Sequence, residues 1–254
     1  MDPDAYLEMA ATETNHWWFI ARRKILSSEI GQLKLPANAN ILEIGAGTGG
    51  NLKMLSAFGN VFALEKDNSA RTIADKNTNH QFDIRAGSCP DQMTFNDVSF
   101  DLICMFDVLE HIEDDAGTLV ALKGLLKKNG KVLITVPAFQ WLWGYHDEFL
   151  HHQRRYTTRK LKMDINAAGL HTHKITYFNT LLFPLAAMAR LKDKMTGSSQ
   201  ASGTSIPPTW INKTFMNVFT SERSLLRHMN FPFGVSILAI IKNRQEEKHV
   251  IEGH

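Results

Sequence analysis

The chain has 254 residues, which is enough for one large domain with an elaborate lid. A hydrophobic fraction of 44% and a charged fraction of 21% are ordinary for a soluble globular protein. The formal net charge of +2 excludes a strong overall attraction to nucleic acid or to an anionic membrane surface.

The first predicted element is a helix over residues 5–31, with two tryptophans, Trp17-Trp18, ahead of three basic residues, 22–24. The simpler interpretation is a helix that packs its aromatic side chains on a sheet, because aromatic residues usually lie in a core. The alternative is a flap over a ligand site, lined by His16, Trp18 or Arg22.

Residues 39–52 predict a short buried strand, a glycine-rich turn and a helix that begins near Thr48 and runs to Phe58. Glycines in such a turn let the backbone approach a ligand closely. Glu43 stands at the carboxyl end of the strand, where open α/β sheets bind ligands. A carboxylate there favours a ligand with an ammonium or sulfonium group over a plain pyrophosphate.

The acid-x-Gly-x-Gly-x-Gly pattern formed by Glu43, Gly45, Gly47 and Gly49 resembles the first motif of class I S-adenosylmethionine (SAM)-dependent methyltransferases. The resemblance implies that the turn binds SAM through Glu43, Gly45, Ala46, Gly47 and Gly49. A His-Trp-Trp-Phe…Arg-Arg segment ahead of this motif is similar to a subfamily in which that segment closes over SAM. Trp18 and Arg22 are therefore expected at the cofactor, with Arg22 as a bidentate partner for the methionine carboxylate.

The second predicted strand, residues 61–65, ends in Glu65, which is suited to accept both ribose hydroxyls; Lys66 follows at the mouth of the site. The third strand, 82–87, leads to Ser88. The family often has an acid here for the adenine amino group, and Ser88 in its place can accept one hydrogen bond.

The fourth predicted strand, 99–107, runs into Asp-Val-Leu-Glu-His-Ile, residues 107–112, which resembles the motif after this strand in quinone-type and other small-molecule methyltransferases. The resemblance implies that Phe106 and Asp107 flank the methionine end of SAM, with His111 on a short helix beneath. A structural and a catalytic role for His111 both remain open. A helix is expected from about residue 113 to Lys128, ended by Asn129-Gly130, before a fifth strand at 131–137.

The loop at 138–156 concentrates aromatic, acid–base and cationic side chains after the fifth strand, which favours a substrate site over a solvated surface. One of His146, His151 and His152 is the expected general base. Arg154 and Arg155 either hold an anionic acceptor or pair with Asp147 and Glu148. The expected substrate-binding residues are Trp141, Tyr145, Arg154, Arg155 and Tyr156. Although His146, Asp147, His151 and His152 could bind a metal, their spacing matches no standard site, so no metal is expected.

The rest of the chain predicts helix 157–168, strand 171–178, an apolar segment at 179–194, a loop at 196–208, helix 210–229, an antiparallel last strand at 235–241 and a disordered tail at 245–254. The expected fold is a Rossmann-like, doubly wound α/β sheet of seven strands, mostly parallel. One domain is expected, divided into an N-terminal helical cap (1–35), a SAM-binding core (36–137) and a substrate loop with lid helices and last strands (138–254).

A SAM-dependent methyltransferase that acts on a small-molecule or lipid-like acceptor, at oxygen, nitrogen or carbon, and releases S-adenosylhomocysteine is the function that the resemblance implies. The alternative is an NAD(P)-dependent oxidoreductase, because Gly45, Gly47 and Gly50 also fit Gly-x-Gly-x-x-Gly and Tyr156-x-x-x-Lys160 matches a dehydrogenase pair. The acid ahead of the glycines and the Asp-Val-Leu-Glu-His string count against it. A catalytically silent partner protein ranks last, since the glycines are intact.

The expected partner is a hydrophobic or anionic small molecule, with no nucleic acid, and the chain is expected to be a monomer or homodimer. The apolar segment 175–191 fits either such an acceptor or ordinary lid packing, and a peripheral membrane contact stays open. Two cysteines without metal-ligand spacing and an acidic N-terminus predict a cytoplasmic protein, peripheral to the inner face of the membrane if it touches lipid.

Overall fold

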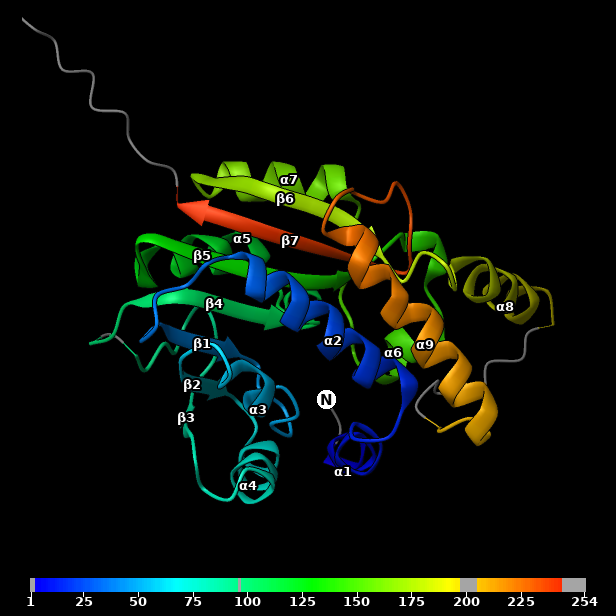
Figure 1. Ribbon diagram of the computed structural model, residues 1–254, viewed down its shortest axis with the longest axis horizontal. Coiled ribbons are helices and arrows are strands. Elements are labelled where there is room, and N and C mark those ends of the chain that lie inside the picture. The colour runs from blue at the N-terminus through cyan, green and yellow to red at the C-terminus, as the bar shows by residue number, and fades with distance from the viewer. Residues whose placement is uncertain (1–2, 96, 197–204, 244–254) are drawn as a thin grey trace, which may run out of the picture.

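Seven strands form one sheet in the computed structural model, which describes residues 3–95, 97–196 and 205–243 (Figure 1). The strands are β1 (Asn40–Ile44), β2 (Asn60–Glu65), β3 (Asp83–Ala86), β4 (Phe100–Phe106), β5 (Leu126–Pro137), β6 (Leu170–Phe178) and β7 (Ser236–Asn243). Their order is β3-β2-β1-β4-β5-β7-β6. The first five run parallel, and β7 is antiparallel to both of its neighbours, β5 and β6. The predicted doubly wound, Rossmann-like fold is confirmed.

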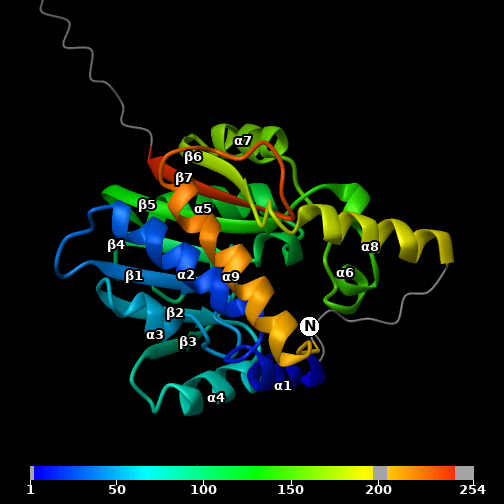
Figure 2. The same cartoon turned by 45° about the vertical axis from the view of Figure 1, so that its right-hand side comes forward.

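Helices cover both faces of the sheet (Figure 2). Their bounds are α1 (Pro3–Thr12), α2 (Trp17–Gln32), α3 (Leu52–Leu55), α4 (Asn68–Asn77), α5 (Asp115–Leu125), α6 (Tyr145–Phe149), α7 (Thr158–Ala167), α8 (Phe183–Thr196) and α9 (Thr209–Leu226), with short 3-10 turns η1 (Leu109–His111) and η2 (Gln140–Leu142). Buried side chains of α2, α3 and α9 form one core against the sheet, and those of α5 and α7 form the other.

The strand order reverses between β1 and β4, and ligands of such sheets bind outside the carboxyl ends of the strands at this point. Alternate residues of β1 belong to opposite cores: Leu42 and Ile44 to the core of α5 and α7, and Ile41 to the core of α2 and α9. Glu43 therefore shares a face with Ile41 and points toward α2. The sheet thus places a carboxylate between the switch point and the first helical layer.

Helices α2 and α9 lie side by side on the same face of the sheet (Figure 1). The indole of Trp17 packs edge-on against Phe215, with ring centroids 5.4 Å apart, and against Phe219 at 6.0 Å. The backbone N–H of Trp17 donates to the Asn212 side-chain oxygen at 2.8 Å. Trp17 therefore has the packing role, and it joins α2 to α9.

The prediction of one helix over residues 5–31 is wrong, since the chain breaks between α1 and α2. His16 has an extended backbone, and its Nδ1 accepts a hydrogen bond from the N–H of Trp18 at 3.2 Å. This is an N-cap, which ends the preceding segment and starts a new helix in a new direction.

The helix predicted over 48–58 is also shorter than expected, because α3 begins only at Leu52. Gly45, Gly47 and Gly49 have φ values of +71°, +54° and +85°, and a right-handed helix requires negative φ. The glycine turn therefore extends through residue 51.

The helix predicted to end at Asn129-Gly130 ends at Leu125 instead, and β5 begins at Leu126. The pairing of Leu126 with Phe100 of β4 draws residues 126–130 into the sheet. Thr157 caps α7 and accepts from the Lys160 N–H at 3.2 Å, and Pro184 lies in the first turn of α8, where proline is tolerated.

Part of the loop predicted at 196–208 and the tail predicted at 245–254 lie outside the described residues. Among the described helices, none combines the length and the apolar character needed to cross a bilayer.

Candidate active site

The glycine turn packs so closely that two of its glycines have no room for a side chain. A Cβ on Gly45 would come within 2.6 Å of a Val108 methyl group, and one on Gly49 within 3.1 Å of the Ala74 Cβ. Val108 belongs to the Asp-Val-Leu-Glu-His string. The two motifs that the sequence singled out are therefore in direct contact, at the carboxyl ends of β1 and β4.

Replacing Gly45 by alanine should lower the free energy of unfolding by about 1–3 kcal/mol, because the new methyl group meets Val108 and the positive φ disfavours any L side chain. Chemical denaturation measures this change. Gly124→Ala is the control: nothing lies within 4 Å of its Cβ position in α5, so a gain of about 0.4–1 kcal/mol is expected. Equal effects at both positions would contradict the packing described here.

Glu65 ends β2 with its carboxylate turned toward the glycine turn. Its two oxygens accept backbone N–H groups of Gly47 at 2.8 Å and Asp67 at 2.9 Å. Lys66 is exposed at the mouth, and Ser88 lies half-buried after β3, where its N–H donates to the Gln92 carbonyl at 3.2 Å. The predicted cofactor residues of β2 and β3 thus share the edge of the sheet that holds the turn.

At the methionine end predicted for SAM, one buried donor and one buried acceptor have no hydrogen-bond partner among the described residues. They are Arg22 Nε and Glu43 Oε2. The guanidinium of Arg22 lies 4.5 Å from the Trp18 ring centroid and pairs through Nη1 with Asp107. An amino-acid group that carries a carboxylate and an ammonium would satisfy both orphan atoms, and SAM has such a group.

Glu43 is the more unusual of the two, because it is 1% exposed. Its Oε1 accepts from the Asn51 side-chain amide at 2.7 Å. Burial raises the pKa of Glu43 to about 8, against smaller lowering contributions from Asn51 and Arg22. A positively charged ligand is the natural means of ionising this carboxylate.

Helix α1 contributes a side-chain stripe that the sequence predictions missed. Met9 Sδ lies 3.8 Å from the Cβ position of Gly47, and a Cβ on Gly50 would overlap the Glu13 carboxylate. Burial, and to a smaller extent the charges of Glu65 and Asp67, raise the pKa of the buried Tyr6 hydroxyl above its usual range. Residues 6 and 9 lie on one face of α1, and Glu13 directly follows the helix, where its N–H donates to the Met9 carbonyl at 2.8 Å; this spacing was the available signal. The flap over the glycine turn is therefore α1, more than the tryptophan pair.

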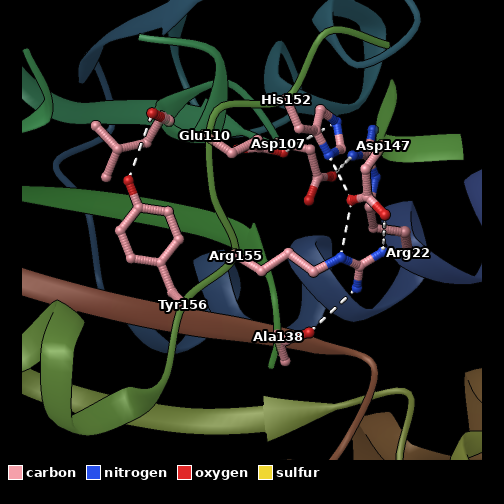
Figure 3. A network of polar contacts seen from close by, with 9 residues as sticks. Arg22, Asp107, Glu110, Ala138, Asp147, His152, Arg155 and Tyr156 are labelled. Atoms are coloured by element: carbon pink, nitrogen blue, oxygen red, sulfur yellow. Dashed lines mark hydrogen bonds and ion pairs between the residues drawn. The ribbon is translucent and has the colours of Figure 1, made fainter. Parts of the chain in front are cut away.

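At the carboxyl ends of β4 and β5 a buried polar network surrounds Asp147, which is fully buried (Figure 3). Arg155 donates to Asp147 twice, from Nε to Oδ1 at 2.8 Å and from Nη2 to Oδ2 at 2.9 Å. His152 Nδ1 lies 2.9 Å from Asp147 Oδ1, and the Gly144 N–H donates to Oδ2 at 2.9 Å. Of the two roles predicted for Arg155, pairing with Asp147 is the one observed.

Beside this network, Glu110, His111 and His152 bring three ligand atoms within 4.8 Å of one another. The rings of His111 and His152 pack edge to face, with centroids 4.6 Å apart. Burial lowers the pKa of His111 to about 3, helped by His152, so the ring is neutral at pH 7. Burial and the nearby Asp107 raise the pKa of Glu110 well above its ordinary value.

The remaining predicted residues occupy different settings. His146 lies half-buried with its ring 6.3 Å from that of His152, whereas His151 is exposed. Arg154 pairs with Asp115 at 2.8 Å and not with Glu148. Tyr156 is buried and donates to Asp115 at 3.0 Å, which makes it a core residue.

Tyr156 and Lys160, the pair that matched a dehydrogenase motif, each bind a different carboxylate and do not form a pair. Lys160 forms an ion pair with Asp164 within α7 and is exposed, whereas the Tyr156 hydroxyl points to Asp115. Trp141 and Tyr145, two predicted substrate-binding residues, are exposed on the segment that follows β5. Phe106 is buried at the end of β4, and Asp107 follows with a φ of +58°.

A family model described as a methyltransferase domain matches residues 10–175. No curated protein matches the chain. Among solved structures, the complex of the Haloferax volcanii Trm112 methyltransferase activator with a methyltransferase is similar at 18% identity, with 97% of each chain covered and a TM-score of 0.62. A sarcosine dimethylglycine methyltransferase from Galdieria sulphuraria follows at 15% identity, with 87% of this chain and 85% of that one covered and a TM-score of 0.58. A SAM-dependent methyltransferase from Clostridium acetobutylicum has 11% identity, coverage of 88% and 91%, and a TM-score of 0.57.

Proposed function

The chain belongs to the methyltransferase-domain family and is a SAM-dependent methyltransferase, and on this basis we propose that it methylates a hydrophobic small molecule taken from a lipid surface. The observation that carries the proposal is the apolar cover over the substrate loop. SAM supplies a methyl group that is already activated on sulfur, so the work of this chain is to position the two reactants and to exclude water.

We assign the cofactor roles by the fit of the orphan atoms described above. Arg22 would hold the carboxylate and Glu43 the ammonium of the amino-acid end. Glu65 would accept the ribose hydroxyls, with Ser88 toward the adenine, and α1 would cover the bound nucleoside through Tyr6. The methyl group would then face Asp107 and the loop that follows β5.

The cover over that loop is helix α8. The Lys194 ammonium donates to the Trp141 carbonyl at 2.7 Å, and the Arg190 guanidinium lies 2.8 Å from the Cβ position of Gly144. Beneath α8, Phe139 stacks on Tyr177 with centroids 4.9 Å apart, and Phe183 meets Trp141 edge-on at 5.9 Å. Aromatic side chains therefore cluster between α8 and the loop that follows β5, which suits an acceptor with an apolar body.

The outer face of α8 is apolar and exposed. Its large exposed residues recur at helical spacing: Leu185, Met188, Leu191 and Met195. The exposed Lys192 accompanies them, whereas Lys194 donates to the Trp141 carbonyl and Arg190 pairs with Asp193; the helix projects from the body of the protein (Figure 1). An apolar face with basic neighbours is the pattern of helices that lie in the headgroup region of an anionic membrane.

The acceptor class is tested with pairs of hydroxylated aromatic compounds that differ only in an alkyl chain. We expect a kcat/KM at least about tenfold higher for the chain-bearing member, since each buried CH2 contributes about 0.8 kcal/mol. Equal values for both members, or transfer only to polar acceptors, would contradict the proposal without affecting SAM binding, which is measured in parallel by calorimetry.

Membrane contact gives a separate prediction. The double variant Leu185→Glu/Met188→Glu should reduce co-sedimentation with anionic vesicles at least about tenfold, because each buried apolar side chain contributes about 1.5–3 kcal/mol. Met163→Glu is the matched control, since Met163 is similarly exposed on α7, away from α8. If both variants bind vesicles as the wild type does, α8 has no role at a lipid surface.

A further inference from the structure

Glu110 poses a problem that the methyltransferase assignment does not solve. Its side chain is 0% exposed, and within the described part of the chain neither carboxylate oxygen has a hydrogen-bond partner. A buried carboxyl group without partners is costly, whether it is ionised or protonated, and native proteins compensate such groups with a hydrogen bond, a paired charge or a metal. The hydrogen bond that the Gln153 N–H donates to Glu110, at 2.8 Å, goes to the backbone carbonyl and leaves the side-chain carboxylate without a partner.

The imidazoles of His111 and His152 lie near the Glu110 carboxylate, and His152 is too far from it for a hydrogen bond. His152 Nε2 lies 3.9 Å from Glu110 Oε1, which is too long for a hydrogen bond. Ligands about 2.0–2.2 Å from a shared zinc-like ion stand roughly 3.4 Å apart in a tetrahedron and at most about 4.2 Å apart. The three ligand atoms of Glu110, His111 and His152 lie within 4.8 Å, so small side-chain rotations would bring them into this range.

His152 is oriented for such a role by its other nitrogen. Its Nδ1 faces Asp147 Oδ1 at 2.9 Å, and Arg155 fixes that carboxylate through two hydrogen bonds (Figure 3). Because Asp147 accepts the Nδ1 proton, the lone pair of the neutral ring lies on Nε2, toward Glu110. Histidines that bind metals show this arrangement, with a carboxylate on the far side of the ring.

We propose that Glu110, His111 and His152 bind one divalent transition-metal ion, which keeps an open coordination position for an oxygen atom of the acceptor. Two imidazoles and one carboxylate favour ions of the zinc, cobalt or manganese type over calcium. Three protein ligands leave at least one position free, as in catalytic rather than structural sites. The oxygen ligand rests on the proposed function, whereas the ion site itself does not.

The ion would give the acceptor both orientation and acidity. A hydroxyl group bound to a divalent ion loses its proton to water more readily, as bound water does. This route differs from the expected general base, because no histidine then has to accept the proton. It also differs from the expectation of no metal, which considered only His146, Asp147, His151 and His152 and their spacing along the chain. Glu110 and His152 are 42 positions apart, so spacing could not bring them together.

The test uses untagged full-length protein stripped of metal, without SAM or acceptor. Calorimetry with Zn²⁺ should give one equivalent bound, and Co²⁺ should produce a visible absorption band. Glu110→Gln, His111→Gln and His152→Gln should each weaken binding by roughly 100-fold or more, because each removes a direct ligand and even outer partners contribute 10–100-fold. His151→Asn, at the adjacent exposed position, should bind as the wild type does.

Folding of each variant is checked by circular dichroism, and Zn²⁺ should raise the Tm of the wild type and of His151→Asn only. Absence of stoichiometric binding in the wild type, or binding retained in all three ligand variants, overturns the site. Because no acceptor is present, failure of the lipid-like acceptor proposal leaves this result unaffected. A chelator should then lower kcat/KM for the acceptor at least tenfold while leaving the affinity for SAM unchanged.

Discussion

Asp147→Ala should lower the free energy of unfolding by about 3–5 kcal/mol. The fully buried Asp147 carboxylate compensates the charge of Arg155, whose side chain is 6% exposed, and it holds His152. Its removal leaves a cation buried without its partner. Urea unfolding followed by circular dichroism measures the loss.

The Asp147 carboxylate also determines how the free energy of unfolding should change with pH. Burial raises the pKa of Asp147, but the hydrogen bonds from His152 and Arg155 outweigh it and hold the pKa below its usual range. A carboxyl group whose pKa is lowered by folding stabilises the folded state at pH values above its pKa in the unfolded chain, about 4. This stabilisation is lost as the pH falls from about 4 toward the lower pKa of the folded state. The stability of Asp147→Ala should therefore be less sensitive to acid than that of the wild type.

Glu148→Ala, at the neighbouring exposed position, is the control and should change the free energy of unfolding by less than about 0.5 kcal/mol. A loss at Asp147 no larger than that at Glu148 would show that the network contributes little.

Glu43→Gln should weaken SAM binding roughly 10- to 100-fold, because a hydrogen bond from a charged group contributes about 1.5–3 kcal/mol. The pKa of Glu43 is about 8, through burial first, with Glu13 and Glu65 adding to it and Asn51 and Arg22 opposing it. A ligand ammonium favours the ionised form, so binding should release a proton at pH 7. Calorimetry in buffers of different ionisation enthalpy measures that proton.

The wild-type affinity should consequently rise between pH 6 and 7.5, by up to about tenfold per unit, and level off near pH 8. The glutamine variant should lose this dependence. Methylthioadenosine, which lacks the amino-acid group, provides the ligand control and should bind both proteins equally. A pH-dependent SAM affinity that survives in Glu43→Gln would assign the proton to another group.

Local patterns in the sequence were enough to predict where several candidate cofactor residues lie in the fold. Glu43, the glycines and Glu65 follow from a strand-turn-strand pattern, and the parallel sheet brings them to one edge. The cap of α7 was predictable for the same reason, since Thr157 acts within its own turn.

What the sequence could not supply depends on contacts between distant positions. The limited length of α3 follows from three positive φ values, and β5 starts early because Phe100 offers Leu126 a partner. The roles of Tyr6 and Glu13 depend on a break at His16 that redirects α1 over the glycine turn. The pairing of Arg155 with Asp147, and the meeting of Glu110 with His152, arise from the path of the loop after β5.

The contact between α2 and α9 has a consequence for how the protein is made. Trp17 and Arg22 belong to the same helix, and the residues that hold Trp17 lie at Asn212, Phe215 and Phe219. During translation the ribosome must pass position 219 before that helix finds its partner. The nascent chain can thus pair its parallel strands before α9 exists, whereas α2 gains its contacts with Asn212, Phe215 and Phe219 only after those residues have been made.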